Sequence, residues 1–65
     1  MNTKRICIYP KDIQRITGRS ERYGRNLINR IKAANSKEKS QFVTISEFSK
    51  YSGISEKEIR TYIID

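Results

Sequence analysis

The chain has 65 residues, of which fourteen are Lys or Arg, seven are Asp or Glu and none is His, so its formal net charge is +7. A chain of this length forms one domain and buries only about 60% of the surface that it exposes when unfolded. Its single cysteine, Cys7, cannot form an internal disulfide, and without histidine there are too few ligands for a zinc or haem site. No apolar run approaches the roughly 20 residues of a membrane span, and no signal peptide is recognisable. We therefore expect a cytoplasmic, nucleoid-associated protein with no metal, no cofactor and no membrane contact, whose charge points first to nucleic acid.

Two helix-turn-helix-like units are predicted, with four helices in one mainly α-helical domain. The first unit covers about residues 6–34, a polar linker covers 35–40, and the second unit covers about 41–63. In the first unit, an extended segment (about residues 4–8) precedes Pro10, which suits the first turn of a helix. Ile13 and Ile16 give this helix an apolar edge, and Gly18 supplies the left-handed backbone that ends it. Ser20 is expected to cap a longer helix over roughly residues 21–34.

The second unit follows the same plan. A second extended segment (about residues 41–45) leads to Thr44, which has capping-box spacing with Glu47. Gly53 ends this helix, and Ser55 caps a last helix over about residues 56–63. The two extended segments have the alternating or β-branched character of strands and could pair as a short two-stranded β ribbon.

An internal repeat appears when Gly18 is aligned with Gly53, an offset of 35 residues. Apolar residues then fall on apolar residues, as Ile13 does on Phe48, and the cap Ser20 falls on the cap Ser55. The alignment indicates shared local structure, whether it arose by duplication or because any two such units pack alike.

The charge distinguishes the two units. Residues 1–35 hold nine bases and two acids, whereas residues 36–65 hold five of each. On the helix expected over residues 21–34, an arc of about 140° is apolar and should pack on the core: Tyr23, Gly24, Leu27, Ile28, Ile31 and Ala34. The opposite side is polar and carries no acid, since Glu21 lies off it at the helix start. Like charges on that side should repel one another unless a phosphate backbone neutralises them.

The polar side of this helix also suits contacts with bases. Arg can donate a bidentate pair of hydrogen bonds to guanine, and Asn pairs similarly with adenine, in a major groove wide enough for a helix. The helix start offers free N–H groups and a positive dipole end to a phosphate. We therefore predict double-stranded DNA binding by Arg19, Ser20, Arg22, Arg25, Asn26, Asn29, Arg30 and Lys32.

Residues 12–31 resemble a helix-turn-helix DNA-binding motif, in which a first helix and a glycine-containing turn precede a recognition helix. Two positions depart from the family pattern, because Arg19 and Gly24 stand where apolar residues are usual. Residues 43–63 are more closely similar to the motif, in particular to the N-terminal segments of MerR-type regulators and to small excisionase-like winged-helix proteins. The resemblance implies sequence-specific DNA binding by a small transcriptional regulator or an excisionase-like accessory factor. In that family the start of the second helix meets DNA, which here implies Ser55, Glu56, Lys57 and Arg60.

Charge favours the first unit as the one that binds DNA, so the second would complete the core, contact a partner or add contacts. Accessory DNA contacts are expected from Lys37, Lys39, Lys57 and Arg60. Because a monomer of this size would touch few base pairs, we expect a homodimer or cooperative assembly. Two other functions stay open: a protein-interaction module that docks its basic helix on an acidic partner, and RNA binding through the same arginines.

Catalysis is not expected, since without histidine no familiar triad can be built and the two serines that precede helices are interpreted as caps. The six aromatic residues are expected to form the core rather than to stack on bases, because they lie at apolar spacing: Tyr9, Tyr23, Phe42, Phe48, Tyr51 and Tyr62. Cys7, between two isoleucines, is expected to be buried or half-buried.

Overall fold

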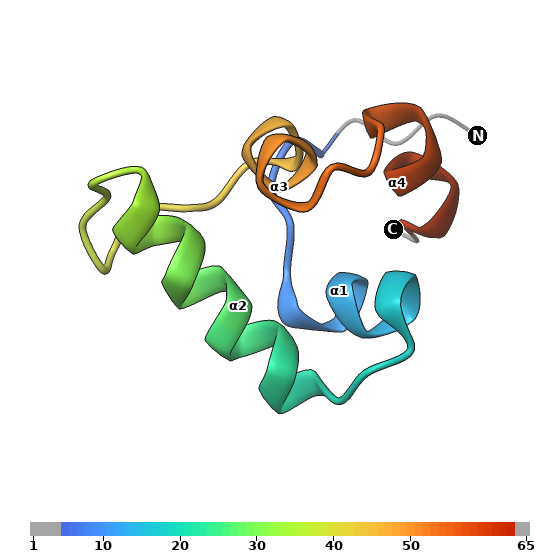
Figure 1. The fold of residues 1–65 in the computed structure, drawn as a ribbon, viewed down its shortest axis with the longest axis horizontal. Coiled ribbons are helices and arrows are strands. Elements are labelled where there is room, and N and C mark those ends of the chain that lie inside the picture. Colours follow the sequence, from blue (N-terminus) through green and yellow to red (C-terminus); the bar gives the residue numbers. More distant parts are fainter. Residues whose placement is uncertain (1–4, 64–65) are drawn as a thin grey trace.

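Four helices make up the structure, a computed structural model that describes residues 5–63. They are α1 (Pro10–Thr17), α2 (Glu21–Ala34), α3 (Ile45–Ser52) and α4 (Glu56–Tyr62), so the prediction of a mainly helical, four-helix fold is confirmed. Contacts join α1 to α2 and α4, and α3 to the same two helices, which closes the helices into a ring. The extended segment before α1 passes between α3 and α1 in the middle of this ring (Figure 1).

The two units begin and end their helices at matching positions. The first residues of α1 and α3, Pro10 and Ile45, are separated by the offset of the sequence repeat, and each helix has eight residues. Gly18 and Gly53 follow these helices with φ of 75° and 81°, the left-handed conformation that glycine adopts without a steric penalty.

Serine caps begin the second helix of each unit, as expected. The Ser20 hydroxyl accepts a hydrogen bond from the backbone N–H of Tyr23 at 3.1 Å, and the Ser55 hydroxyl accepts one from that of Glu58 at 3.2 Å. Each bond satisfies one of the N–H groups that the first turn of a helix leaves without a partner.

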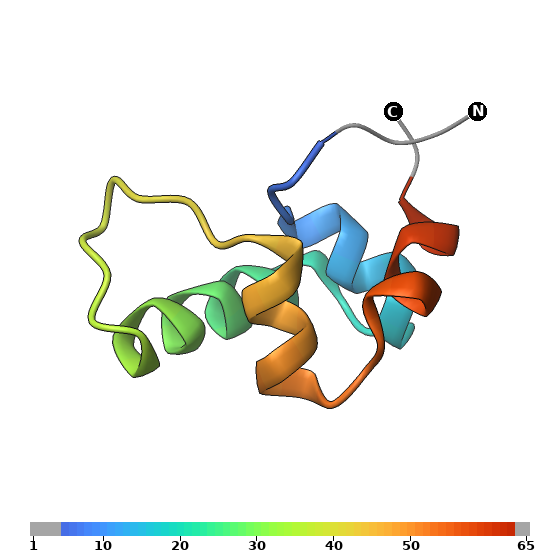
Figure 2. The ribbon, with the colours of Figure 1, turned by 90° about the horizontal axis from the view of Figure 1, so that it is seen from above.

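The expected β ribbon is wrong. Within residues 5–63, the two extended segments form a single antiparallel bridge between Cys7 and Thr44. Two backbone hydrogen bonds flank it, from Ile8 N–H to the Val43 carbonyl at 2.9 Å and from Ile45 N–H to the Ile6 carbonyl at 2.7 Å. The ladder cannot lengthen because α1 starts at Pro10 and α3 starts directly after Thr44, as seen from above in Figure 2. Cys7 is half-buried as expected, and Lys4, the first residue of the expected ribbon, lies outside the described residues.

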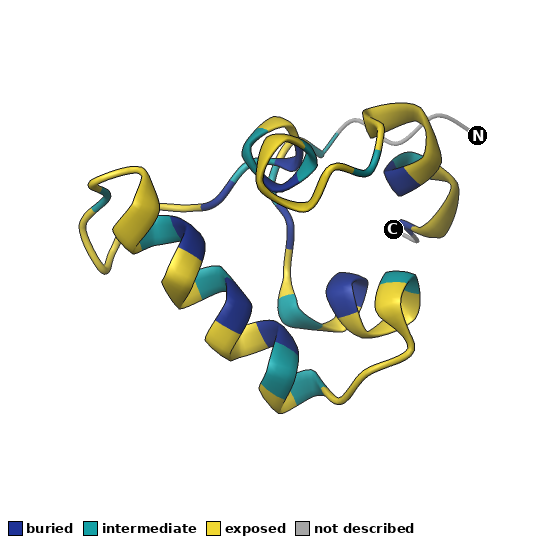
Figure 3. Ribbon diagram, in the orientation of Figure 1, coloured by how far each residue is buried: buried dark blue, intermediate teal, exposed yellow. Residues whose placement is uncertain are grey.

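One core joins the two units, because both contribute buried side chains to it (Figure 3). Nine apolar residues form this core: Ile8, Ile13, Leu27, Ile31, Val43, Ile45, Phe48, Ile59 and Ile63.

The prediction of an aromatic core is wrong for most of its members. Among the six aromatic residues, Phe48 is buried and Tyr23 packs partly against the core, while four are exposed: Tyr9, Phe42, Tyr51 and Tyr62. Side chains alternate along an extended backbone, so once Ile8 and Val43 point inward their neighbours Tyr9 and Phe42 must point outward. The isoleucines of all four helices fill the space that the aromatic rings were expected to occupy.

Candidate nucleic-acid interface

Helix α2 carries most of the residues predicted to bind DNA, and Gly24 sets its position. Gly24, Leu27 and Ile31 are buried on one side, as the periodicity predicts, whereas Ala34 at the end of the helix is exposed. A Cβ atom on Gly24 would lie 2.6 Å from the Pro10 carbonyl oxygen, closer than real Cβ contacts allow. The glycine therefore lets α2 lie directly against the start of α1.

The opposite side of α2 is exposed along its length. Arg22, Arg25, Asn26, Asn29 and Arg30 are all exposed. At about 1.5 Å per residue, they extend over about 12 Å of the helix. The structure therefore brings these predicted residues together on one continuous face.

Some of the expected cations on α2 have partners within the protein. Glu21 forms an ion pair with Arg25 at an N–O distance of 3.4 Å. The expectation that this acid lies apart from the polar face is therefore wrong. The two residues are one helical turn apart and can meet on the helix surface. The Arg19 guanidinium lies over the Tyr23 ring, 4.8 Å from its centroid. The side chains of Arg22, Asn26, Asn29 and Arg30 make no hydrogen bond or ion pair with the residues that the structure describes.

The expected accessory residues fall into two groups that do not meet. Lys37 and Lys39 follow α2 in the linker, whereas Lys57 and Arg60 belong to α4. In both Figure 1 and Figure 2, α2 and α4 lie on opposite sides of the molecule. The Arg60 guanidinium donates a hydrogen bond to the Arg5 carbonyl at 3.3 Å, which ties it to the extended segment.

Lys37 also has a partner, Glu47 of α3, at an N–O distance of 3.0 Å. The pKa of Glu47 lies below its ordinary value, chiefly because its carboxylate accepts a hydrogen bond from the Thr44 N–H and also because of Lys37. The Thr44 hydroxyl accepts in return from the Glu47 N–H at 3.0 Å, so the expected capping box is confirmed.

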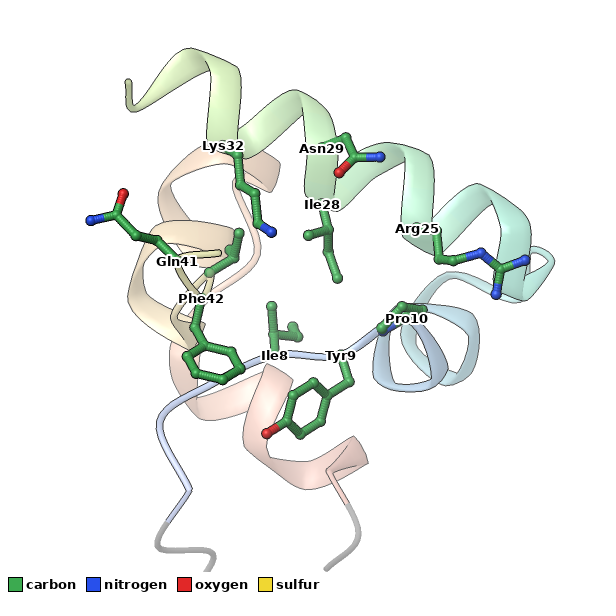
Figure 4. A pocket seen from close by; sticks show the side chains of 10 residues that line it. Ile8, Tyr9, Pro10, Arg25, Ile28, Asn29, Lys32, Gln41 and Phe42 are labelled. Atoms are coloured by element: carbon green, nitrogen blue, oxygen red, sulfur yellow. The ribbon is translucent and has the colours of Figure 1, made fainter. Parts of the chain in front are cut away.

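A groove of about 230 Å³ runs beside α2, and sequence reasoning missed it (Figure 4). Ile28, Asn29 and Lys32 contribute one wall from α2, and the two extended segments contribute the other, which includes Tyr9 and Phe42. Both aromatic residues had been assigned to the core. One signal in the sequence could have predicted their exposure. Each ring is adjacent to a β-branched residue in an extended segment, and only one of two adjacent side chains can face the core.

Comparison with protein-family models, curated proteins and solved structures finds no match to this chain. Of the helices in the described part of the chain, none has the length and apolar character needed to cross a membrane.

Proposed function

We propose that this protein binds double-stranded DNA through the exposed face of α2, as a small transcriptional regulator or an excisionase-like accessory factor. The observation that carries the proposal is the stripe of Arg22, Asn26 and Arg30, which are exposed and have no polar partner among the described residues. The major groove is about 12 Å wide and admits a helix. Arg side chains there can neutralise phosphates or contact guanine, and Asn26 can contact adenine.

The exposed start of α4 is a weaker candidate for the DNA-binding element. Glu56 and Glu58 flank Lys57 there, and all three residues are exposed. Two carboxylates beside one ammonium group would repel phosphates more than they attract them. We therefore propose that the second unit serves to complete the core and that α2 makes the DNA contacts.

Selection of bound duplexes from a random-sequence library, in parallel with single-stranded RNA, tests the proposal. We expect a recovered duplex motif, and an affinity for it that falls with a slope of about −4 to −5 in log affinity against log salt, given about five phosphate contacts. Recovery of RNA alone, or a slope near zero, would contradict duplex binding.

Asn26→Ala and Asn29→Ala test whether α2 recognises sequence. Loss of a bidentate contact to a base should cost about 1–3 kcal/mol on the selected duplex and little on random duplexes. Arg30→Ala is the matched control, because loss of a phosphate contact weakens all duplexes alike. Equal losses on selected and random duplexes after both Asn substitutions would reduce the proposal to non-specific binding.

We also propose that the bound form is a homodimer, since one recognition helix of this length spans few base pairs. Sedimentation of the protein with and without the selected duplex measures this. A 1:1 complex on a site without inverted symmetry would contradict the dimer and leave the α2 interface standing.

A further inference from the structure

An exposed aromatic pair lies beside the α2 interface. Because Cys7 lies opposite Thr44 in the antiparallel bridge, Tyr9 lies opposite Phe42, and both point away from the core. Phe42 is 63% exposed and Tyr9 is 43% exposed. Two exposed rings that lie side by side can present flat apolar faces to a ligand.

The groove places these rings opposite basic and amide groups. In Figure 4, Ile28 points from α2 into the groove toward Ile8, while the Tyr9 and Phe42 rings lie near each other at the opposite edge of the groove and extend away from α2. Asn29 and Lys32 stand along the α2 wall. No acidic side chain among the described residues lines the groove, so it suits a ligand that combines a flat apolar surface with negative charge.

A second hollow of about 240 Å³ adjoins the groove and is more basic. The two hollows share Asn29 and Lys32, and the second is also lined by Lys37 and Lys39 of the linker. The Lys32 ammonium donates a hydrogen bond to the Lys39 carbonyl at 2.7 Å, which holds the linker beside α2. This basic notch therefore continues the groove along the same side of the helix.

We propose that the groove binds an unpaired nucleotide of a single-stranded DNA segment that continues from the duplex bound by α2. Its base stacks on Phe42 beside Tyr9, and the next phosphates lie in the notch against Lys32 and Lys39. Aromatic platforms beside a basic track are the arrangement by which proteins bind single strands, since every base has a face that can stack. The duplex part of this substrate rests on the function proposed above, whereas the groove binds the unpaired base independently of it.

The amide groups of the groove favour a nucleotide over an acidic peptide as the occupant. Asn29 and Gln41 line it from opposite walls, and each side chain offers both donors and an acceptor to the edge of a base. An acidic amphipathic peptide would use the apolar floor and Lys32, but only a base offers a flat face that can stack on Phe42 together with polar edges for the amides.

Binding of three fluorescent DNAs by anisotropy tests the proposal: a blunt duplex, the same duplex with a single-stranded overhang, and the overhang strand alone. With 2-aminopurine in the overhang, stacking on Phe42 should also quench the emission of this base. We expect the overhang to strengthen binding, and Phe42→Ala to remove about 5- to 150-fold of affinity for the two DNAs that contain it, with loss of quenching. Affinity for the blunt duplex should stay unchanged.

Two control variants separate stacking from general damage. Phe42→Tyr keeps a ring and should retain both the affinity and the quenching. Tyr51→Ala removes a ring of similar exposure, 47%, on α3 outside the groove, and should change neither. Equal losses from Phe42→Ala and Tyr51→Ala, or equal losses on blunt and overhang DNA, would overturn the proposal.

The remaining outcomes distinguish this proposal from the function of α2. If the blunt duplex fails to bind but the single strand is bound and quenched in a Phe42-dependent way, the α2 proposal fails and the groove proposal stands. The same result with a single-stranded RNA of matching sequence supports the groove proposal, because base stacking and phosphate contact are common to both nucleic acids. If the overhang adds nothing and a fluorescent peptide of alternating Glu and Leu binds in a Phe42-dependent way, the groove proposal is overturned in favour of an acidic protein partner.

Discussion

The two halves of this protein share a scaffold and differ in what they expose. Residues 6–34 and residues 41–63 each contain an extended segment, an eight-residue helix, a left-handed glycine and a serine-capped second helix. The second helix of the first unit has fourteen residues and a stripe of unpartnered Arg and Asn, whereas α4 has seven residues and two acids in its first turn. The two units therefore share one backbone plan and differ in the charge of the surface they expose, and the proposed DNA interface follows from that charge.

The interiors of the two units differ as well. The carboxylate at the third position of the first helix is buried in one unit and partly exposed in the other. Asp12 is only 2% exposed and pairs with Arg5 at 2.6 Å and with Arg15 at 3.4 Å, whereas Glu47 is half-buried and pairs with Lys37 at 3.0 Å. Each carboxylate also accepts a hydrogen bond from the backbone N–H three residues before it.

The largest expected effect comes from Asp12→Ala. The substitution removes a buried carboxylate that accepts hydrogen bonds from the Arg5 guanidinium and the Tyr9 N–H, which should cost about 3–5 kcal/mol. Glu47→Ala removes a cap and a surface ion pair and should cost about 0.5–2 kcal/mol. A domain of this size has about 3–10 kcal/mol of stability in total, so the first variant approaches unfolding at room temperature. Urea denaturation of the two variants measures the difference.

A double-mutant cycle separates the interaction energy of each ion pair from the other effects of removing its two side chains. Arg5→Ala combined with Asp12→Ala should show strong coupling, whereas Lys37→Ala combined with Glu47→Ala should show only about 0.2–1 kcal/mol. Equal coupling in the two cycles would contradict the difference in burial between the units.

The next effect is on DNA affinity and compares the exposed faces of the two units. Arg22→Ala with Arg30→Ala should lower the salt slope by about 2, which corresponds to a loss of about 60-fold at 0.1 M salt. Lys50→Ala with Lys57→Ala removes the same charge from exposed positions in the second unit and should leave the slope nearly unchanged. Duplex titrations at several salt concentrations measure both. Equal losses from the two pairs would show that total charge, rather than the α2 face, determines binding.

A third effect concerns the close approach of α2 to the start of α1 at Gly24. At an exposed helix position, a Gly→Ala substitution raises helix propensity and stabilises the protein. At Gly24 the added Cβ would clash with the Pro10 backbone, so Gly24→Ala should lower the free energy of unfolding by about 1–3 kcal/mol. The equivalent position in α4 is Ile59, whose side chain is fully buried and fills the core. Thermal unfolding measures the change, with Ala33→Gly on the exposed side as a control that should cost about 1 kcal/mol. A stabilised Gly24→Ala variant would contradict the close approach of α2 to α1.

Local signals in the sequence predicted the helices and their ends, because Pro10, the two turn glycines and the capping serines act on their immediate neighbours. The i,i+4 spacing of Glu21 and Arg25 also allowed their ion pair to be predicted. It was missed because Glu21 lies at the start of the helix and was treated as separate from the polar face. The exposure of Tyr9 and Phe42 was harder to predict, since each stands next to an equally apolar residue and only the pairing of the two segments decides which one faces inward. The role of Gly24 depends on Pro10, a contact between helices that no local pattern specifies. The exposed polar face of α2 was therefore predictable from one helix, whereas the groove required the arrangement of three segments.

The smallest effect is a pH dependence that belongs to the second unit. Because the pKa of Glu47 is lower in the folded state than in the unfolded state, the unfolded chain binds the proton more readily as the solution becomes acidic. The resulting stabilisation is present above the unfolded value, about 4.3, and is lost as the pH falls through the lower folded value. Glu47→Gln keeps an oxygen that can accept from the Thr44 N–H but removes the titration and the attraction to Lys37. We expect the wild type to exceed this variant by less than about 1 kcal/mol at pH 7 and to lose that advantage progressively as the pH falls below about 4.3.

Urea denaturation of both proteins between pH 7 and pH 3 measures this advantage, because the two proteins differ in the Glu47 carboxylate alone. Glu38→Gln in the linker is the matched control, since the Glu38 carboxylate forms no ion pair among the described residues. An advantage that persists unchanged at pH 3 would show that the Glu47 carboxylate stabilises α3 through its shape and packing rather than through its charge. The start of α3 would then depend on a hydrogen bond that a neutral side chain at this position can also accept from the Thr44 N–H.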